Sequence, residues 1–494
     1  MWVYNEDGEL VVQLERYAMR AFTGGAASPV HYHQVVLEPV ATPEPAPWPA
    51  SVLIVGAEEA TAAALAALPA AAAAVTTTAT PAELAAGTDR VAAILYLAPS
   101  APATGLEEIR AGMAQFLAVA KAAPRRLVGG GRLVVLAGAG LAPLGAAVNP
   151  LQYAIVSSAR VVSMENPRVV VTAISDPDLD IERAVTLGLT EQLAGHKVLL
   201  SADGVLDEAV RPHPAALPVR VVQPDTHILV TGGFGGIGME YVETLWRDHQ
   251  AHAVVFGRRS VEDLAASDDP VDVAKAARVT ALRAEGMQLR FVACDLADKA
   301  QVDAALAQVA AEGITIKGVV HFAGVPDNGM LFRKETADLE QITGPKALAA
   351  VHLLDALGEQ VDFFLAASTM TTITGSAGAF GYSLANAYLE GLARAGTGIS
   401  TVRWPGWKET GMALAFGIAE AEEDTYLMRS MTTNEGREYV RRTLSGVFTD
   451  LIAGDFAARA GEILDPYLSY ADASSPASPS ASSAPAGRPP AKPS

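Results

Sequence analysis

A glycine-rich turn between an apolar run and a predicted helix constrains this chain more than any other feature. Residues 227–238 read HILVTGGFGGIG, so that Gly233, Gly235 and Gly238 have the spacing G-x-G-x-x-G. The apolar residues 228–230 predict a buried strand, and residues 239–246 predict a helix. Glycines allow a tight turn and a close approach to a pyrophosphate, which the positive helix N-terminus attracts. The segment therefore predicts the strand–turn–helix of a dinucleotide-binding fold.

Further apolar runs follow the turn and predict the parallel strands of one sheet. They cover residues 253–257, 290–296, 318–324 and 363–369. Ligands of open parallel sheets bind outside the carboxyl ends of the strands. We therefore expect the residues that close the second and third of these runs to face a cofactor, namely Asp295, Leu296, Ala323 and Gly324.

Arg258 and Arg259 come directly after the run at 253–257. Many NAD sites carry an acidic residue there for the ribose 2′-hydroxyl, whereas an arginine suits the additional 2′-phosphate of NADP. We expect Arg258 to bind that phosphate and NADPH to be the cofactor. The alternative is that both arginines are solvated surface residues.

Tyr382 lies beyond the fifth predicted strand and is a candidate acid. Its hydroxyl can give a proton to the alkoxide that forms when a nicotinamide hydride reaches a carbonyl. Because an unperturbed tyrosine titrates near pH ~10, it needs a nearby cation to work near neutrality. The ordinary short-chain dehydrogenase pattern has a lysine four residues later, but that residue is Asn386 here. Lys346, on a predicted helix between the fourth and fifth strands, is the cation that this chain offers instead.

Several motifs occur in the order that is typical of one family. They are TGGFGGIG (231–238), HFAGV (321–325), PK (345–346), YSLANA (382–387) and RWPGWKETGM (403–412). On these motifs the chain resembles the ketoreductase domain of modular polyketide synthases, a branch of the short-chain dehydrogenase superfamily. The resemblance covers roughly residues 28–455.

The resemblance implies NADPH-dependent reduction of the β-keto group of a polyketide thioester on an acyl carrier protein. Tyr382 would donate the proton, with its pKa lowered by Lys346 and its orientation set through Asn386. No metal is expected. The cofactor would contact residues of the glycine turn and the following strand ends, namely Thr231, Gly233, Phe234, Gly235, Gly236, Ile237, Gly238, Arg258, Asp295, Leu296, Ala323 and Gly324.

The hydroxyl that contacts the substrate carbonyl is ambiguous. The family's catalytic serine lies thirteen residues before the tyrosine, and that position is Thr369 in this chain. A threonine hydroxyl can make the same hydrogen bond. A one-residue insertion in the loop would bring the neighbouring Ser368 to this place instead. A third possibility is an impaired site, in which both are ordinary strand-end hydroxyls.

The N-terminal half repeats the alternation of strands and helices. Its predicted strands cover residues 51–57, 94–98, 132–138 and 168–174. The turn after the first of them reads GAEEAT, and Glu58 and Glu59 place negative charge where a pyrophosphate should lie. We therefore predict an α/β fold of two Rossmann-like subdomains, a degenerate N-terminal structural copy and a C-terminal NADPH-binding catalytic copy. Residues 149–167 resemble the family's segment near the end of the first copy.

The expected organisation has four parts. Residues 28–225 form the structural subdomain, residues 226–455 the catalytic subdomain, and residues 456–494 a C-terminal extension whose Ser/Ala/Pro-rich part, 473–494, predicts a flexible linker toward a carrier protein. Residues 1–25 would be the tail of an upstream domain. Within them, residues 2–21 predict two strands around an Asp-Gly turn, and they resemble the closing hairpin of a polyketide dehydratase domain. The alternative is an N-terminal hairpin of this same domain.

Composition excludes several other functions. The formal charge of −19 argues against nucleic acid as a partner, and no apolar run has the length and character of a membrane span. The chain opens MWVYNEDGEL, which predicts no signal peptide. The one cysteine, Cys294, lies in a predicted strand and can form no intrachain disulfide, which fits a reducing cytoplasm.

Two rival functions stay open at this stage, an epimerising ketoreductase fold without net reduction and a non-catalytic NADP-binding or scaffolding module. His321 is expected to be structural, at the end of a buried strand, and Trp404 and Trp407 are expected to pack. One product class of the family carries an L-D-D stretch, and the other tends to carry a tryptophan before the catalytic tyrosine. This chain keeps Asp327 of that stretch but has Asn328 where its last aspartate would fall, and it has no tryptophan in residues 370–381. The retained Asp327 and the missing tryptophan favour the L-D-D class.

Overall fold

Two units make up the chain in the computed structural model, residues 1–30 and residues 31–494. The described residues are 2–4, 10–13, 30–214, 217, 222–327, 329–412, 427–444, 446, 448–457, 460–464 and 468–470. In the first unit, strands β1 (Trp2–Tyr4) and β2 (Leu10–Gln13) pair antiparallel, with Val3 opposite Val12. The expected Asp-Gly turn between them and the expected linker at 473–494 lie outside the described residues.

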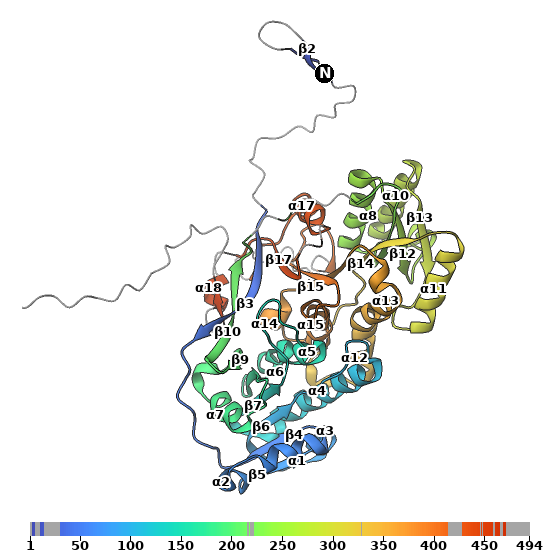
Figure 1. Cartoon of the computed structure of the whole chain (residues 1–494). Coiled ribbons are helices and arrows are strands. Elements are labelled where there is room, and N and C mark those ends of the chain that lie inside the picture. The colour runs from blue at the N-terminus through green and yellow to red at the C-terminus, as the bar shows by residue number, and fades with distance from the viewer. Residues whose placement is uncertain are drawn as a thin grey trace, which may run out of the picture. The chain divides into compact units, whose positions relative to one another are not determined.

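One sheet runs through the second unit (Figure 1). Its C-terminal half contains β11 (His227–Thr231), β12 (His252–Gly257), β13 (Leu289–Ala293), β14 (Ile316–His321), β15 (Phe364–Thr369), β16 (Ile399–Trp404) and β17 (Asp450–Ala453). These strands are parallel and lie in the order β13-β12-β11-β14-β15-β16-β17. The chain therefore changes direction across the sheet between β11 and β14, which is the switch point where doubly wound sheets bind their ligands.

The N-terminal half of the sheet repeats this layout with fewer strands. It contains β4 (Val52–Val55), β5 (Thr76–Ala79), β6 (Val91–Leu97), β7 (Leu127–Ala137), β8 (Val170–Ser175) and β9 (Lys197–Ser201). They are parallel and lie in the order β5-β4-β6-β7-β8-β9. All four residues of β4 are buried, as expected of a strand covered on both faces.

Two antiparallel strands join the halves into one sheet. Strand β3 (Tyr32–Val40) lies between β10 (Gly204–Pro212) and β17, and β10 in turn pairs with β9. His33 of β3 is opposite Ile452 of β17. A short strand, β18 (Ser469–Tyr470), adds to β10. The last strand of each parallel half is therefore paired rather than exposed as an edge.

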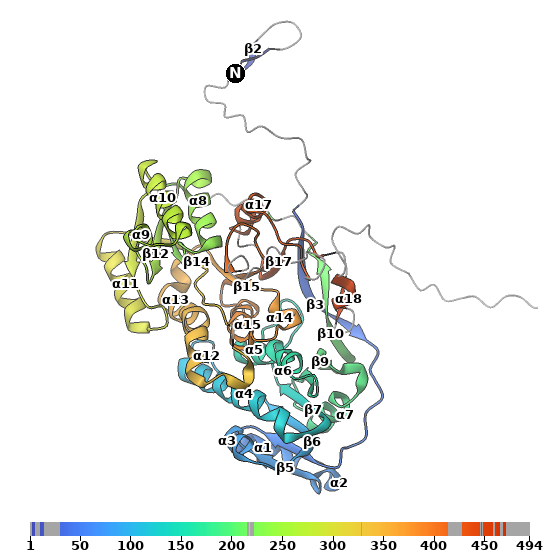
Figure 2. The same cartoon turned by 180° about the vertical axis from the view of Figure 1, so that it is seen from behind.

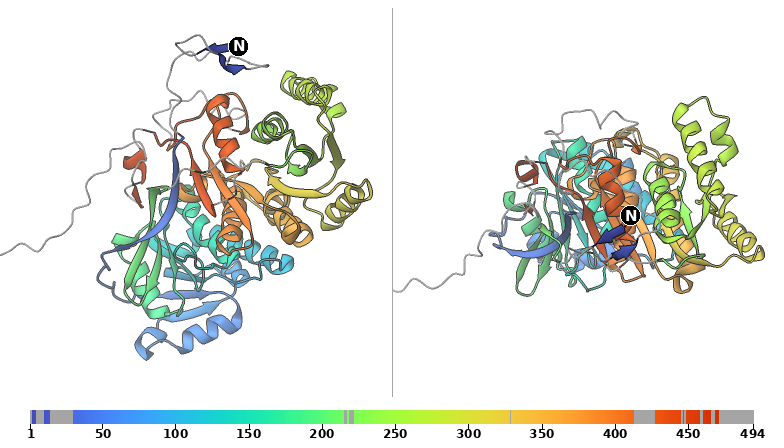
Figure 3. Two further views of the ribbon diagram at one scale, coloured as in Figure 1. Left: turned by 45° about the horizontal axis from the view of Figure 1, so that its top comes forward. Right: turned by 90° about the horizontal axis from the view of Figure 1, so that it is seen from above.

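Helices cover the sheet on both faces. The N-terminal half has α1 (Glu58–Ala66), α2 (Ala70–Ala73), α3 (Pro81–Ala86), α4 (Leu106–Arg126), α5 (Pro150–Ser158), α6 (Arg160–Glu165), α7 (Ile181–Gly188) and the short η1 (Glu191–Leu193). Figure 3 shows α1 to α3 beside β4 and β5, and α10 and α11 toward the opposite edge. The C-terminal half has α8 (Gly236–His249), α9 (Val261–Ala265), α10 (Pro270–Ala284), α11 (Lys299–Ala311), η2 (Leu331–Arg333), α12 (Thr336–Thr343), η3 (Gly344–Leu348), α13 (Ala349–Leu357), η4 (Gly358–Gln360), α14 (Thr371–Thr374), α15 (Phe380–Arg394), α17 (Thr433–Thr443) and α18 (Ala460–Leu464).

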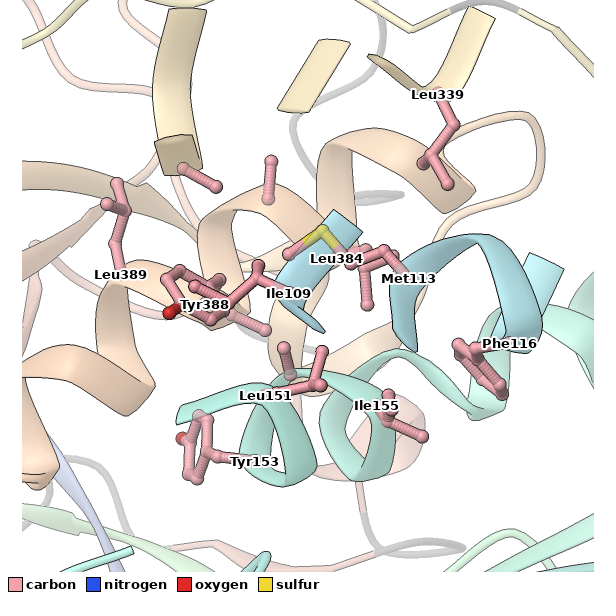
Figure 4. Close-up of a cluster of buried hydrophobic side chains, with 14 of the residues drawn as sticks. Ile109, Met113, Phe116, Leu151, Tyr153, Ile155, Leu339, Leu384, Tyr388 and Leu389 are labelled. Carbon is pink, nitrogen blue, oxygen red and sulfur yellow. The ribbon is translucent and has the colours of Figure 1, made fainter. Parts of the chain in front are cut away.

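The two halves share a core between α4, α5, α12 and α15 (Figure 2). Helices α5 and α15 approach so closely that a Cβ on Gly391 would lie 2.8 Å from the Pro150 backbone. Figure 4 shows the side chains that meet there from both halves. They are Ile109, Met113 and Phe116 of α4, Leu151, Tyr153 and Ile155 of α5, Leu339 of α12, and Leu384, Tyr388 and Leu389 of α15.

A buried charge network lies beside this core. Arg403 of β16 pairs with Glu390 of α15 at 2.6 Å and with Asp450 of β17 at 2.5 Å, and all three side chains are at most 1% exposed. Tyr153 of the N-terminal half contributes its hydroxyl, 3.2 Å from the Arg403 guanidinium. Removing one partner from such a network leaves an uncompensated buried charge, at a cost of about 3–5 kcal/mol.

Candidate active site

The predicted glycine turn connects β11 to α8. Gly232 adopts φ +68°, and a Cβ on Gly238 would lie 2.3 Å from the Gly232 oxygen. A Cβ on Gly236 would lie 2.4 Å from the Gly411 nitrogen, so residue 411 also approaches the turn. Phe234 is the one residue with a side chain among residues 232–236, which lead into a 14-residue helix, and this glycine-rich turn suits a pyrophosphate.

Arg258 and Arg259 behave differently. Arg259 pairs with Asp272 at 2.8 Å. Arg258 is exposed directly after β12, and its guanidinium has no hydrogen bond or ion pair among the described residues. Arg258 is therefore the arginine that is available to an external phosphate.

The other residues expected to face the cofactor lie at the carboxyl ends of β11, β13 and β14. Thr231 closes β11, and its Oγ1 accepts a hydrogen bond from the Ala323 nitrogen at 3.3 Å. Gly324 follows Ala323 and is exposed. Phe234 stacks on Phe291 of β13, with ring centroids 5.7 Å apart, and Ile237 is half-buried near Gly411.

The strand expected at 290–296 is shorter than predicted, and Cys294 lies outside it. Strand β13 ends at Ala293 because the Asp295 Oδ1 accepts a hydrogen bond from the Ala297 nitrogen at 3.0 Å and starts a turn. Asp295 and Leu296 therefore lie in this turn, just past the strand end.

Tyr382 is the third residue of α15 and lies near the end of β15. Burial raises the pKa of its hydroxyl, while side-chain hydrogen bonds with Thr369 and Asn386 lower it, and the net shift is upward. The hydroxyl is consequently protonated at neutral pH, as a proton donor must be. The Asn386 Nδ2 donates to the Tyr382 backbone oxygen at 2.8 Å, and its buried Oδ1 has no partner among the described residues.

Ser368 and Thr369 occupy opposite faces of β15, as neighbouring strand residues do. The Ser368 hydroxyl donates to the Glu390 carboxylate and belongs to the buried charge network. The Thr369 side chain lies close to the Tyr382 hydroxyl and lowers its pKa. The structure thus places Thr369, and not Ser368, beside the tyrosine.

Lys346 lies in η3, a turn of π-helix, a conformation that occurs frequently at functional sites. It is 4% exposed, and burial lowers its pKa to about 8. Its Nζ is 3.5 Å from the Ala323 oxygen and therefore lies at the carboxyl end of β14.

His321 closes β14 and links the glycine turn to the lysine segment. Burial lowers its pKa to about 3, so the ring is neutral and has one N–H. Since the Lys346 backbone oxygen, 2.9 Å from Nε2, can only accept, Nε2 donates to it, and Nδ1 accepts from the Thr231 hydroxyl at 2.7 Å. The ring is buried with both nitrogens occupied, which is a structural role. Trp404 and Trp407 are also buried and contact each other edge to face.

Two carboxylates lie beside the site that the sequence did not predict as site residues. Asp327, considered above only for product class, accepts hydrogen bonds from the Gly381 and Tyr382 nitrogens at 2.8 and 3.2 Å. Glu165 of the N-terminal half accepts from the Leu331 and Gly378 nitrogens at 2.5 and 3.0 Å. No motif in the sequence indicates Glu165, because its partners are backbone amides 166 and 213 residues away.

At the carboxyl ends of strands β6 and β7 in the N-terminal half, a side chain of the protein hydrogen-bonds to the backbone. Gln152 of α5 accepts from the Ala139 nitrogen at 2.8 Å and donates to the Ala98 oxygen at 2.9 Å. Its side chain therefore links the residues that follow β6 and β7. Glu58 and Glu59 occupy the first turn of α1, as expected from the sequence.

The sheet order, the glycine turn and the tyrosine helix define a Rossmann-like fold of the short-chain dehydrogenase/reductase type. Residues 226–409 match the KR domain family. Among solved structures, an A1-type ketoreductase has a TM-score of 0.69 at 26% identity, covering 85% of this chain and 92% of that one. The first ketoreductase of the tylosin PKS has a TM-score of 0.67 at 21% identity, covering 89% and 96%. The chain is a ketoreductase (KR) domain of the polyketide synthase family and matches those of modular synthases in structure, which confirms the predicted family and two-subdomain α/β fold.

Sequence relatives are far longer than this chain. Erythronolide synthase EryA3 of Saccharopolyspora erythraea is 32% identical over 277 residues, which is 54% of this chain and 8% of that protein. The 5-methyl-1-naphthoate synthase of Streptomyces sahachiroi is 30% identical over 455 residues, which is 85% of this chain and 25% of that protein. Domains of this family thus occur within multidomain assembly-line proteins. Within the described residues, no helix has the length and apolar character needed to cross a bilayer.

Proposed function

We propose that this chain reduces the β-keto group of a polyketide thioester, carried by an acyl carrier protein, to a β-hydroxy group with NADPH. The observation that carries the proposal is the position of the Thr369 side chain, which lies close enough to Tyr382 to lower the pKa of its hydroxyl, at the same edge of the sheet as the glycine turn. A protonated hydroxyl and a second hydroxyl beside it are what a substrate ketone needs as it becomes an alkoxide.

The residues present fit NADPH. The glycine-rich turn before α8 accommodates the pyrophosphate, and Arg258, which has no partner among the described residues, is available to bind the 2′-phosphate. Phe234, Ile237, Asp295, Leu296, Ala323 and Gly324 would complete the contacts with the cofactor. When bound, NADPH supplies the hydride.

The chain's own residues then handle the oxygen and the proton. Thr369 donates a hydrogen bond to the keto oxygen and so polarises the carbonyl. Tyr382 gives its proton to the same oxygen as negative charge develops there. Lys346, which carries a positive charge below pH ~8, favours the resulting tyrosinate, and Asn386 orients the tyrosine through its first helical turn.

We further propose the four-part organisation set out from the sequence, with a dehydratase-type tail at 1–25 and a linker toward a carrier protein at 473–494. The neighbouring synthase domains and the acyl carrier protein would be its partners in the cytoplasm. The buried free thiol of Cys294 is compatible with a reducing compartment.

NADPH oxidation in the presence of a simple β-ketothioester tests the function. Turnover by the unmodified chain supports it. Cofactor binding without turnover would favour a scaffolding module, and deuterium exchange at the α-carbon without net reduction would favour an epimerising domain. Chiral analysis of the alcohol tests the product class expected from Asp327.

A further inference from the structure

One carboxylate of the N-terminal half contacts two loops of the C-terminal half. Loop A covers residues 322–327 and 329–334 after β14, and loop B covers residues 375–379 before α15. The Glu165 Oε2 accepts from the Leu331 nitrogen in loop A, and its Oε1 accepts from the Gly378 nitrogen in loop B. Glu165 therefore links the two loops directly to each other.

Loop B has the backbone of a segment that depends on such contacts. Gly375 and Gly378 adopt φ +73° and +80°, a region that favours glycine. Neither residue belongs to a strand or helix, so the Glu165 bond is not part of any regular ladder. Met164, next to Glu165, lies close to Gly375, since a Cβ on Gly375 would be 2.7 Å from the Met164 Sδ.

A second carboxylate links loop A to the catalytic helix. The Asp327 Oδ2 accepts from the backbone nitrogens of Gly381 and Tyr382, in the first turn of the 15-residue helix α15. A carboxylate at this position is favoured by the helix dipole. Its Oδ1 is 2.5 Å from the Lys334 Nζ, and both side chains are 2% exposed, so each charge depends on the other.

Lys334 is itself held by the N-terminal half. Lys121 of α4 donates to the Lys334 backbone oxygen at 2.5 Å and pairs with Glu335 at 2.9 Å. Loop A is therefore linked at both Leu331 and Lys334 to the half of the molecule that has no cofactor turn.

We propose that Glu165 and Asp327 are positioning residues for the reduction. This inference rests on the function proposed above. Asp327 sets the first turn of α15, and with it Tyr382, relative to loop A. Glu165 sets loop A relative to loop B. The degenerate half therefore contributes a functional residue to the active site beyond its packing surface.

Kinetics and amide hydrogen exchange of the full chain test the Glu165 contribution. We expect Glu165→Ala to lower kcat about tenfold, since small misplacements of reacting groups are costly, while NADPH affinity and the thermal midpoint stay near wild type. Exchange should accelerate at the Leu331 and Gly378 amides. Glu165→Gln, which keeps a side-chain oxygen acceptor, should recover part of the loss. The matched control is Glu182→Ala on an exposed turn of α7 in the same half, with no expected change.

A second substitution, at Lys334, tests the Asp327 contribution separately. Asp327→Asn leaves the Lys334 charge buried without its counterion, so both kcat and stability should fall. In the double variant Asp327→Asn/Lys334→Met, stability should recover because no buried charge remains. Turnover should recover only in part, since an amide oxygen holds the α15 amides more weakly than a carboxylate does.

Each outcome decides the inference. Unchanged turnover in Glu165→Ala would overturn it, even if exchange at the loops accelerates, because the contact would then be structural only. Unchanged exchange would show that Glu165 does not hold the loops. If the unmodified chain reduces no β-ketothioester, the proposed function fails, whereas exchange at the same amides still decides whether Glu165 links the loops.

Discussion

The two halves of the sheet have the same strand layout but carry different residues at the carboxyl ends of their strands. After its first strand, the C-terminal half has a glycine-rich turn, whereas the N-terminal half has Glu58 and Glu59 there. After its second strand, the C-terminal half has Arg258, which has no partner among the described residues. At the next strand ends, the C-terminal half presents Lys346, and the N-terminal half is filled by Gln152. A few residues at one edge thus distinguish the half that is proposed to bind NADPH from the other half, while buried apolar residues form the core of both.

The helices that face each other sharpen this comparison. Helix α15 carries Tyr382 on its first turn, and α5 packs along it from the other half. Tyr153 of α5 directs its hydroxyl to the buried Arg403 rather than to a ligand. The N-terminal half thus provides a surface on which the helix that carries Tyr382 packs.

The largest expected effect is on Tyr382. Tyr382→Phe removes the proton donor and should lower kcat by ~10²–10⁴-fold with NADPH affinity unchanged. The same substitution in the facing helix, Tyr153→Phe, should leave kcat near wild type and cost about 1 kcal/mol of stability, because it removes a hydrogen bond to Arg403. Steady-state kinetics, cofactor titration and denaturant unfolding measure the pair. Retained turnover in Tyr382→Phe would refute the mechanism.

The next effect separates Thr369 from Ser368. Thr369→Val removes the hydroxyl beside Tyr382 and should lower kcat by roughly 10²-fold, as the loss of one oxyanion donor does, while Thr369→Ser should retain activity. Ser368→Ala should instead reduce stability, since Glu390 loses a buried hydrogen bond. Rate and unfolding measurements on the three variants distinguish the roles. An inactive, fully folded Ser368→Ala protein would contradict this assignment.

A smaller effect concerns the two arginines. Arg258→Ala should reduce the preference for NADPH over NADH by roughly 10–100-fold in kcat/KM, because an arginine–phosphate pair is a strong charge-assisted contact. Arg259→Ala is the matched control, since Arg259 is already paired with Asp272. Equal cofactor ratios in the two variants would remove Arg258 from the site.

The smallest effect is a pH dependence. Burial lowers the pKa of Lys346 to about 8, so its charge is present below that pH and is lost as the pH rises through it. In the proposed mechanism this charge favours the tyrosinate, so kcat should fall on the alkaline side of pH ~8. Lys346→Arg, which keeps its charge, should abolish this alkaline limb, whatever its effect on the maximal rate. A wild-type profile that stays flat to pH ~9.5 would contradict the role of Lys346.

The sequence was sufficient for features that depend on local pattern. The glycine turn, the parallel strands and the family follow from spacing and apolar runs, and the structure and comparisons confirm the fold and the family. The side of β15 that each hydroxyl faces could not be predicted, because shifting the strand by one residue exchanges Ser368 and Thr369. Gln152 and Glu165 could not be predicted either, because they bond backbone groups that only the tertiary fold brings near them.

The position of strand β3 affects the order in which the sheet can form while the chain is being synthesised. It is made early, yet its partners are β10 in the middle of the chain and β17 near residue 450. Beside it, His31 meets Asp455, 424 residues later, at 2.5 Å. Contacts of such long range close slowly, and β3 keeps an unpaired edge until β17 has left the ribosome. Among the described strands, β3 therefore has the longest interval between its own synthesis and that of its partner, β17.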